Sequence, residues 1–157
     1  MSAGKHIVAT NRKARHQFHI VETYEAGLVL LGTEVKALRE GKVSLIDGYA
    51  RFQASELYLL DIHIGAYSHA SVADHDPLRE RKLLLSRREL GKLRKAVEVK
   101  GQTLVPLSVY FKGGWAKVDL AIAVGKQLRD KRRDLADRDA KRQLERVMKS
   151  RRGARHR

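Results

Sequence analysis

The stretch LVPLSVYFKGGWAKVDLAIAV (residues 104–124) decides the fold, because it reads as two strands joined by a tight turn. Apolar positions recur at every second residue of the run 115–124, which is typical of a half-buried strand. Lys112-Gly113-Gly114 joins this run to the one before it, and glycine adopts the positive φ that a hairpin turn needs. Pro106 has no N–H to donate, so we expect it at an edge or a bulge. The stretch predicts a β-hairpin.

Two further pairs of strands are predicted upstream of this hairpin. Alternation over residues 18–24 is followed by Glu25-Ala26-Gly27, which offers a turn before the apolar run 28–31. The second pair is predicted at 50–52 and 57–64. The chain should therefore contain six or seven short strands.

Short helices interrupt these strands. Thr33 can cap a first helix, and Ser86 with Glu89 has the spacing of a capping box for a second. Asp76-Pro77 reads as a cap followed by proline at the first position of a third. The helix after Ser86 should bury Leu90, Leu93 and Val97. We expect a mainly-β protein, an oligonucleotide-binding-type antiparallel β-barrel with two to three peripheral helices; a split α+β sandwich is the alternative.

The charge of the chain is high and uneven. Its 157 residues carry a formal net charge of +15, which indicates a polyanionic partner, most simply nucleic acid. Residues 125–157 hold 14 Lys+Arg against 5 Asp+Glu, and their apolar content is low. We therefore predict an RNA-binding domain over 1–124 and a basic tail over 125–157.

Several function classes are excluded or disfavoured. The absence of cysteine excludes disulfides, zinc ribbons and thiol catalysis. No apolar run of about 18 residues and no secretory signal is present, so we expect a cytoplasmic protein without a membrane partner. The histidine- and aspartate-rich segment 69–76 has no metal-ligand spacing and reads as a structural polar loop. We expect no metal, no cofactor and no enzymatic activity.

Two stretches of the predicted domain suit an RNA partner. The segment 11–16 places Asn11, Lys13, Arg15 and His16 ahead of the first long strand, and such side chains contact phosphates, sugars and base edges. The leucine triplet 83–85 cannot place all three side chains in one core. One leucine must lie at the surface, either covered by a helix or offered to a partner as an apolar platform.

The tail contains a thin apolar stripe at helical spacing. Such a stripe buries too little to offset ordering costs of about 1–2 kcal/mol per residue, so we expect the tail to be disordered or fluctuating until it binds. A phosphate-rich surface would relieve its charge repulsion and let it form a helix. A membrane-surface helix is disfavoured, because the stripe has no Trp or Phe. The stripe consists of Leu128, Leu135, Ala136, Ala140, Leu144, Val147 and Met148.

Five short motifs occur in the order found in one known family. The chain resembles the SsrA-binding protein family, also called small protein B, over about residues 7–149. Each motif alone is weak, but five in order at matching spacing are specific. The motifs are NRKARH (11–16), GTEVKALR (32–39), RKLLL (81–85), VPLSVYF (105–111) and GK (125–126) followed by DKR (130–132).

This resemblance implies a barrel of the oligonucleotide-binding type and a role in trans-translation. The barrel would bind the tRNA-like domain of transfer-messenger RNA, support its alanylation and accompany it to stalled ribosomes. The tail would enter the empty mRNA channel near the decoding centre. The implied partners are transfer-messenger RNA and the ribosome, with elongation factor Tu and alanyl-tRNA synthetase reached through the RNA. The protein would act as a monomer.

The resemblance also assigns residues. For RNA binding it implies Asn11, Glu25, Leu84, Lys36 of the second motif and Lys126, and it places the family's decoding-site histidine at His16. For the ribosome it implies Asp130, Lys131 and Arg132, together with Val147, Met148 and Lys149. Gln127 stands where the family often has a second lysine. A structural rRNA-binding protein of the ribosome is the alternative function, and an RNA-cleaving enzyme is a third.

Overall fold

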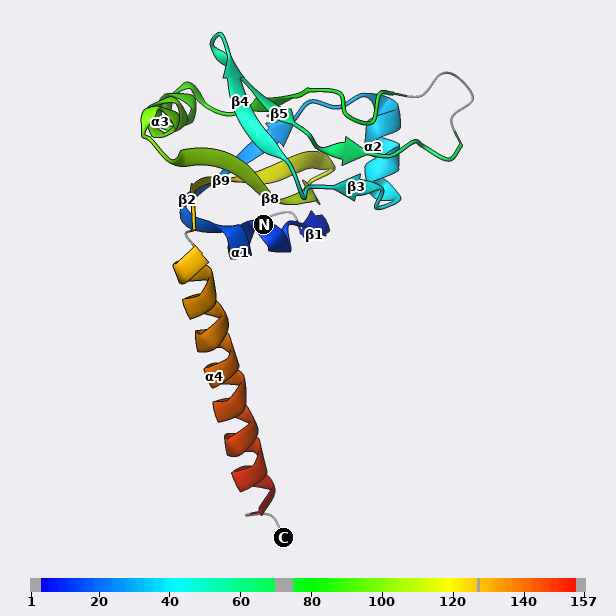
Figure 1. The fold of residues 1–157 in the computed structure, drawn as a ribbon. Coiled ribbons are helices and arrows are strands. Elements are labelled where there is room, and N and C mark those ends of the chain that lie inside the picture. Colours follow the sequence, from blue (N-terminus) through cyan, green and yellow to red (C-terminus); the bar gives the residue numbers. More distant parts are fainter. Residues whose placement is uncertain (1–3, 70–74, 127, 155–157) are drawn as a thin grey trace. The chain divides into compact units, whose positions relative to one another are not determined.

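The computed structural model describes residues 4–69, 75–126 and 128–154, and it divides the chain into two units, Met1–Gly125 and Lys126–Arg157 (Figure 1). The second unit contains α4 (Leu128–Ala154). The first contains β1 (Lys5–Thr10), α1 (Arg12–Gln17), β2 (Phe18–Leu28), α2 (Gly32–Arg39), β3 (Val43–Ser44), β4 (Tyr49–Gln53), β5 (Glu56–Leu60), β6 (His63–Ile64), β7 (Arg81–Leu84), α3 (Arg87–Glu98), β8 (Gln102–Lys112) and β9 (Trp115–Gly125).

Six strands of the first unit close into an antiparallel barrel. Around the ring, β8 pairs with β9, β9 with β2, β2 with β7, β7 with β5, β5 with β4, and β4 again with β8. β1 extends the sheet by pairing with the other end of β8, and β3 with β6 forms a separate short sheet. The expected mainly-β fold with an antiparallel barrel is confirmed, and the α+β sandwich is not what forms.

The hairpin read from residues 104–124 is present as β8 and β9. Its turn uses φ values of 58° at Gly113 and 80° at Gly114, which are in the region that favours glycine. Pro106 lies at a register shift between β8 and β9, as expected for a residue that cannot donate to the ladder.

The turn expected at Glu25-Ala26-Gly27 does not form, and β2 runs without a break from Phe18 to Leu28. Gly27 pairs with Leu84 of β7 on one side and with Lys117 of β9 on the other. A Cβ atom on Gly27 would lie 3.3 Å from the Cβ of Leu84. The glycine therefore permits a close approach between strands instead of a chain reversal.

The helix predictions need three corrections. Leu31, not Thr33, is the N-cap residue of α2, and the Thr33 hydroxyl instead lies 2.9 Å from Nδ1 of the buried His75. Asp76-Pro77 does not begin a helix. It begins a tight turn, in which the Arg79 N–H donates to the Asp76 carbonyl at 3.2 Å. On α3 the Ser86 cap is confirmed, but Val97 is exposed.

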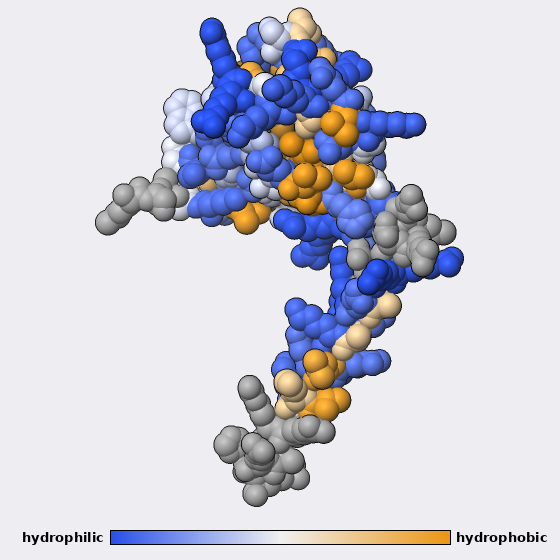
Figure 2. Space-filling view, turned by 90° about the vertical axis from the view of Figure 1, so that its left-hand side faces the viewer, coloured by the Kyte–Doolittle hydropathy of each residue, from blue (hydrophilic) through white to orange (hydrophobic). Residues whose placement is uncertain are grey.

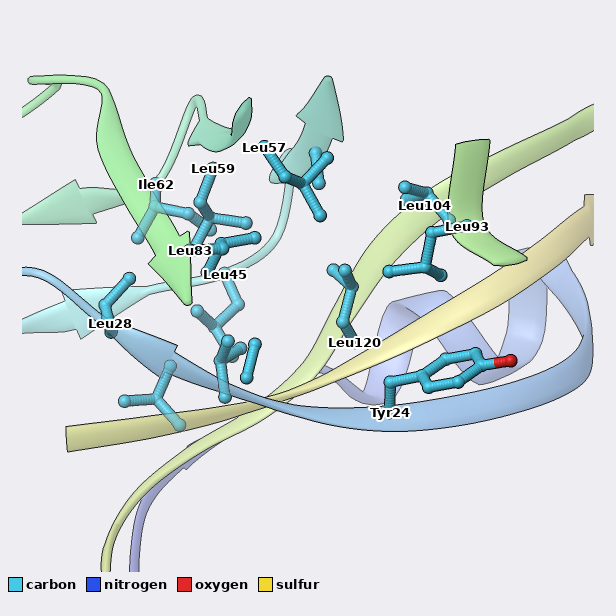
Figure 3. Close-up of a cluster of buried hydrophobic side chains, with 14 of the residues drawn as sticks. Tyr24, Leu28, Leu45, Leu57, Leu59, Ile62, Leu83, Leu93, Leu104 and Leu120 are labelled. Atoms are coloured by element: carbon cyan, nitrogen blue, oxygen red, sulfur yellow. The ribbon is translucent and has the colours of Figure 1, made fainter. Parts of the chain in front are cut away.

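Leucine side chains fill the barrel. Figure 3 shows residues of this cluster drawn from β2, β5, β7, β8 and β9, with Leu93 reaching in from α3. Leu38 joins the cluster from α2, and α2 and α3 lie on opposite sides of the first unit in Figure 1. Leu38, Leu57, Leu59, Leu93, Leu104 and Leu120 are all at most 1% exposed.

A buried ion cluster ties α2 to β7. Glu34, which is fully buried, accepts from Arg81 Nε at 2.6 Å, from an Arg79 guanidinium N–H at 2.5 Å and from the Leu31 N–H at 2.8 Å. Arg81 also donates to the Ile62 carbonyl at 2.6 Å. Burial acts to raise the pKa of Glu34, but the hydrogen bonds from Arg79, Leu31 and Arg81 outweigh it and hold that pKa below its usual value.

The second unit contains α4, which is helical from Leu128 to Ala154, the form that we expected the tail to take on binding. All of its described side chains are exposed. Asp137 precedes Lys141 by four residues and Glu145 precedes Lys149 by four, an order of acid and base that favours a helix by about 0.2–0.5 kcal/mol per pair. No proline interrupts the segment.

Candidate nucleic-acid interface

The segment 11–16, expected to contact RNA, folds as a cap and a short helix against the outside of the barrel. Ala14 is the buried residue of α1 and packs against Val105, Leu107, Ala121 and Ala123. These four side chains point away from the core, so α1 covers part of the outer side of β8 and β9 (Figure 1).

Asn11 holds α1 in place. Its Oδ1 accepts from the Ala14 N–H at 3.2 Å, and its Nδ2 donates to the carbonyls of Leu45 at 3.1 Å and Pro106 at 3.0 Å. The residue is only 4% exposed. Its side-chain donors and acceptor are thus all engaged within the protein, and the structure gives Asn11 a positioning role.

The cations of α1 lie on its solvent side. Lys13 and Arg15 are exposed and His16 is half-buried, while Ala14 between them faces the barrel. A short helix with one buried residue turns its other side chains outward. It therefore presents positive charge over the outer side of β8 and β9.

Next to α1, a polar row crosses three strands. Glu25 of β2 pairs with Asp119 of β9, which pairs with Ser108 of β8. Directly opposite residues of antiparallel strands share a face. The Tyr110 hydroxyl donates to the Glu25 carboxylate and also lies 3.0 Å from Asp119 Oδ1. Glu25, which we expected at a hairpin tip, is instead a mid-strand residue fixed by a hydrogen bond.

Two lysines balance the carboxylates of this row. Lys5 Nζ lies 3.1 Å from Asp119 and 3.9 Å from the centre of the Tyr110 ring. Lys112 Nζ lies 3.5 Å from Glu25. The hydrogen bond from Tyr110 is the main cause that lowers the pKa of Glu25, with Lys112 adding to it. Burial, with the two carboxylates, raises the pKa of Tyr110. Glu25 is thus held as a carboxylate.

One step further along the strands, Leu84 lies on the same side. Gly27 is paired with both Leu84 and Lys117, and Lys117 is paired with Tyr110. Leu83 is 2% exposed and belongs to the core, whereas Leu84 is 53% exposed. The surface leucine of the triplet is therefore the middle one, and of our two alternatives it is the uncovered platform.

We call this continuous surface the outer face. It runs from α1 across Glu25, Tyr110 and Asp119 to Lys117 and Leu84. Strand register places these residues together although Glu25 and Tyr110 are 85 positions apart in sequence. Lys36 is exposed on α2, with its Nζ 5.3 Å from the centre of the Tyr67 ring, and is not part of these rows.

Tyr110, Asp119 and Lys117 belong to this surface but were not predicted as site residues from the sequence. A usable signal was present: Ser108, Tyr110 and Lys112 alternate with apolar residues in one strand. In the next strand Trp115, Lys117 and Asp119 do the same. Polar side chains at period two mark the outward side of each strand. This pattern does not predict which other strands lie beside β8 and β9.

The residues expected to meet the ribosome belong to the second unit. Arg132, Val147, Met148 and Lys149 are exposed on α4, and Lys126 precedes the helix. Figure 2 shows hydrophobic side chains of α4 set among hydrophilic ones. The expectations for Asp130 and Lys131 concern side chains that lie outside the described residues. In the described part of the chain, no helix is long and apolar enough to cross a membrane.

Comparison with known proteins supplies the family. A family model described as SmpB protein matches residues 8–150. The chain belongs to the SmpB protein family. The resemblance drawn from the five motifs is thereby confirmed.

Similar SmpB relatives span nearly the whole chain. The SsrA-binding protein of Thermobifida fusca (strain YX) is 52% identical over 149 residues, covering 95% of this chain and 93% of its own. The SsrA-binding protein of Syntrophomonas wolfei is 54% identical over 144 residues, covering 92% of each. A solved structure described as "tmRNA-SmpB: a journey to the center of the bacterial ribosome" contains a chain that is 53% identical. The match covers 76% of this chain and 85% of that one, with a TM-score of 0.65.

Proposed function

We propose that this protein binds the tRNA-like domain of transfer-messenger RNA and works with it in trans-translation on stalled ribosomes. The observation that carries the proposal is the outer face, where the cations of α1, a fixed carboxylate and an exposed leucine lie together on one surface of a barrel of this family. The names of the relatives and of the solved complex support the same RNA and the same ribosomal setting.

Each group on the outer face has a chemical role in this proposal. Lys13, Arg15 and His16 contact phosphates and sugars, because they are cationic or polar and point outward. Glu25 accepts hydrogen bonds from base or ribose donors, and its low pKa keeps it an acceptor. Leu84 offers an apolar surface to a sugar or base. Outside this face, Lys36 of α2 and Lys126 of the second unit add positive charge for the RNA backbone.

The second unit serves the ribosome. The segments Asp130–Arg132 and Val147–Lys149 lie on α4, a basic helix whose described side chains are all exposed. Such a helix suits the empty mRNA channel, whose walls are rich in phosphate. The barrel then holds the RNA, supports its alanylation and accompanies it with elongation factor Tu, while the helix engages the decoding centre.

This role requires no bond to be made or broken by the protein. We assign it no catalytic residue, metal or cofactor, and we place it in the cytoplasm as a monomer that acts through its RNA. The first test is to sequence the RNA that copurifies with the protein. If the protein leaves the ribosomes in a high-salt wash and carries transfer-messenger RNA, the proposal is supported. If it stays on the washed ribosomes and carries rRNA, a structural ribosomal protein is favoured instead.

The salt dependence of binding tests the outer face. The logarithm of the affinity for the tRNA-like domain should fall linearly with the logarithm of the salt concentration. Removing two phosphate contacts with Lys13→Ala and Arg15→Ala should reduce that slope by about 1.5. Lys92→Ala with Lys95→Ala removes the same charge from α3 and is the matched control. Equal slopes for both double variants would refute the placement of the RNA on this face.

Truncation tests whether the barrel binds the RNA while α4 serves the ribosome. A chain that ends at Gly125 retains every strand of the barrel, so it should fold and bind the RNA. Without α4 it should fail to support tagging of stalled nascent chains. Full tagging by this truncated chain would refute the role given to the second unit.

A further inference from the structure

An apolar groove continues the outer face beyond Leu84. It has a volume of about 440 Å³, and its lining residues come from β2, the segment between β2 and α2, α2, β7, β8, β9 and the turn between β8 and β9. Three large apolar side chains in it are open to solvent: Trp115 is 73% exposed, Leu84 53% and Val29 42%. Exposed apolar side chains gathered in one place mark a binding surface more often than scattered ones do.

The strand backbone explains why the groove stays open. Trp115 is the first residue after the Gly113-Gly114 turn, so its indole stands at the end of the hairpin. Gly27 forms part of the lining, and it contributes no side chain between Leu84 and Lys117. The Trp115 ring, 73% exposed on the wall of this groove, leaves its surface open to another flat ring.

The charge around the groove indicates which kind of ligand it binds. Lys117 is the charged residue among its lining, and Lys112 is paired with Trp115 across the hairpin. Lys5 of β1 is in turn paired with Lys112. Because Lys112 and Lys5 also face the carboxylates of Glu25 and Asp119, Lys117 supplies the net positive charge at the groove, which suits a ligand with a flat apolar part and a negative part. A nucleotide of an RNA strand has both.

We infer that this groove binds an unpaired nucleobase of the RNA, stacked on the Trp115 indole with its phosphate beside Lys117. The inference rests on the proposed function, because it places the base at the end of the same outer face that holds Glu25 and Tyr110. Continuity with that polar row favours RNA over a lipid or an apolar peptide. Base–aromatic stacking tolerates any base, so the groove selects single-stranded structure and not sequence.

The single tryptophan of the chain makes the proposal directly measurable. A base stacked on Trp115 should quench and shift its fluorescence. We expect this change with the tRNA-like domain of transfer-messenger RNA and with a short single-stranded oligoadenylate at low salt. A blunt duplex RNA, whose bases are all paired, should leave the signal unchanged.

Affinity measurements on variants complete the test. Trp115→Ala should weaken binding of the tRNA-like domain roughly ten- to hundred-fold. Trp115→Phe should restore most of the loss, because a phenyl ring still stacks. Val99→Ala is the matched control, since Val99 is also 53% exposed but does not line the groove. Circular dichroism should show all three variants folded.

The outcomes separate the two proposals. Binding of the tRNA-like domain without any fluorescence change, or equal affinities for Trp115→Ala and wild type, overturns the groove and leaves the proposed function standing. Quenching by oligoadenylate without binding of the tRNA-like domain overturns the proposed function and leaves the groove standing. No change with any single-stranded probe overturns the groove.

Discussion

Replacing Glu34 with glutamine should destabilise the barrel more than any surface change. Glutamine keeps the size of the side chain and an oxygen that can accept, but it removes the charge facing Arg81, which is fully buried. Breaking a buried ion pair by removing one partner costs about 3–5 kcal/mol. Arg79 is 34% exposed and can return to water, and Arg81 keeps its bond to the Ile62 carbonyl. We therefore expect the unfolding free energy to fall by about 3 kcal/mol, the low end of this range, and Tm to fall by roughly 10 °C.

Thermal and urea unfolding of the full chain, followed by circular dichroism, measure this loss. Glu56→Gln is the control, because Glu56 pairs with Lys82 at a similar 2.9 Å but on the surface, where both side chains are solvated. It should leave Tm nearly unchanged. Equal effects of Glu34→Gln and Glu56→Gln would refute the argument that burial makes the difference.

The pH dependence of stability in the wild type and in Glu34→Gln tests the same ion cluster. The pKa of Glu34 is lowered by folding, so its charge stabilises the native state above the ordinary value of 4.5. That contribution is lost as the pH falls below 4.5 toward the folded-state pKa. The gap in unfolding free energy between wild type and Glu34→Gln should therefore narrow as the pH falls from 5 to 3. A gap that stays constant over this interval would show that the ionic contribution is absent.

Three further outcomes are expected. Asn11→Ala removes the cap of α1 and should cost about 1 kcal/mol or more of stability; it should also weaken RNA binding, and an unchanged Tm in thermal unfolding would contradict its buried role. Tyr110→Phe removes the hydroxyl that lowers the pKa of Glu25, so NMR titration should show that pKa rising, while a shift in the other direction would contradict the assigned hydrogen bond. A peptide of residues 125–157 should be only partly helical in dilute buffer and gain helix with ribosomes, and circular dichroism that is high and unchanged on addition would refute this.

Local patterns in the sequence predicted the elements whose causes are local. The hairpin of β8 and β9 follows from Gly113-Gly114 and from alternation in the strand after them. The start of α3 follows from the reciprocal bonds of Ser86 and Glu89. Gly27 was misread because a glycine at a turn and a glycine at a close approach look the same in a sequence. Only the position of Leu84 distinguishes them.

Elements without a pattern of their own could not be predicted. α1 buries Ala14 alone, so its six residues show no helical periodicity, and β1 owes its place to pairing with β8. The motifs named several residues of the interface, but not that most of them share one side of the barrel. That fact depends on strand register, which joins Glu25 to Asp119 across the sheet. Tyr110 lies in one of those motifs, and nothing local marks it as the partner of Glu25.

The barrel has a seam, and its position has a mechanical consequence. β4 meets β8 through the single pair Ala50 and Leu104, and two residues later Pro106 has no N–H with which to continue that ladder. Near this seam the Asn11 amide donates to the carbonyl of Pro106 in β8 and to that of Leu45, in the segment that leads into β4. The same side chain caps α1. Asn11 therefore couples the two features. If the barrel opens between β4 and β8, α1 loses the side chain that holds it in place. The closure of the barrel and the orientation of Lys13 and Arg15 thus depend on the same residue.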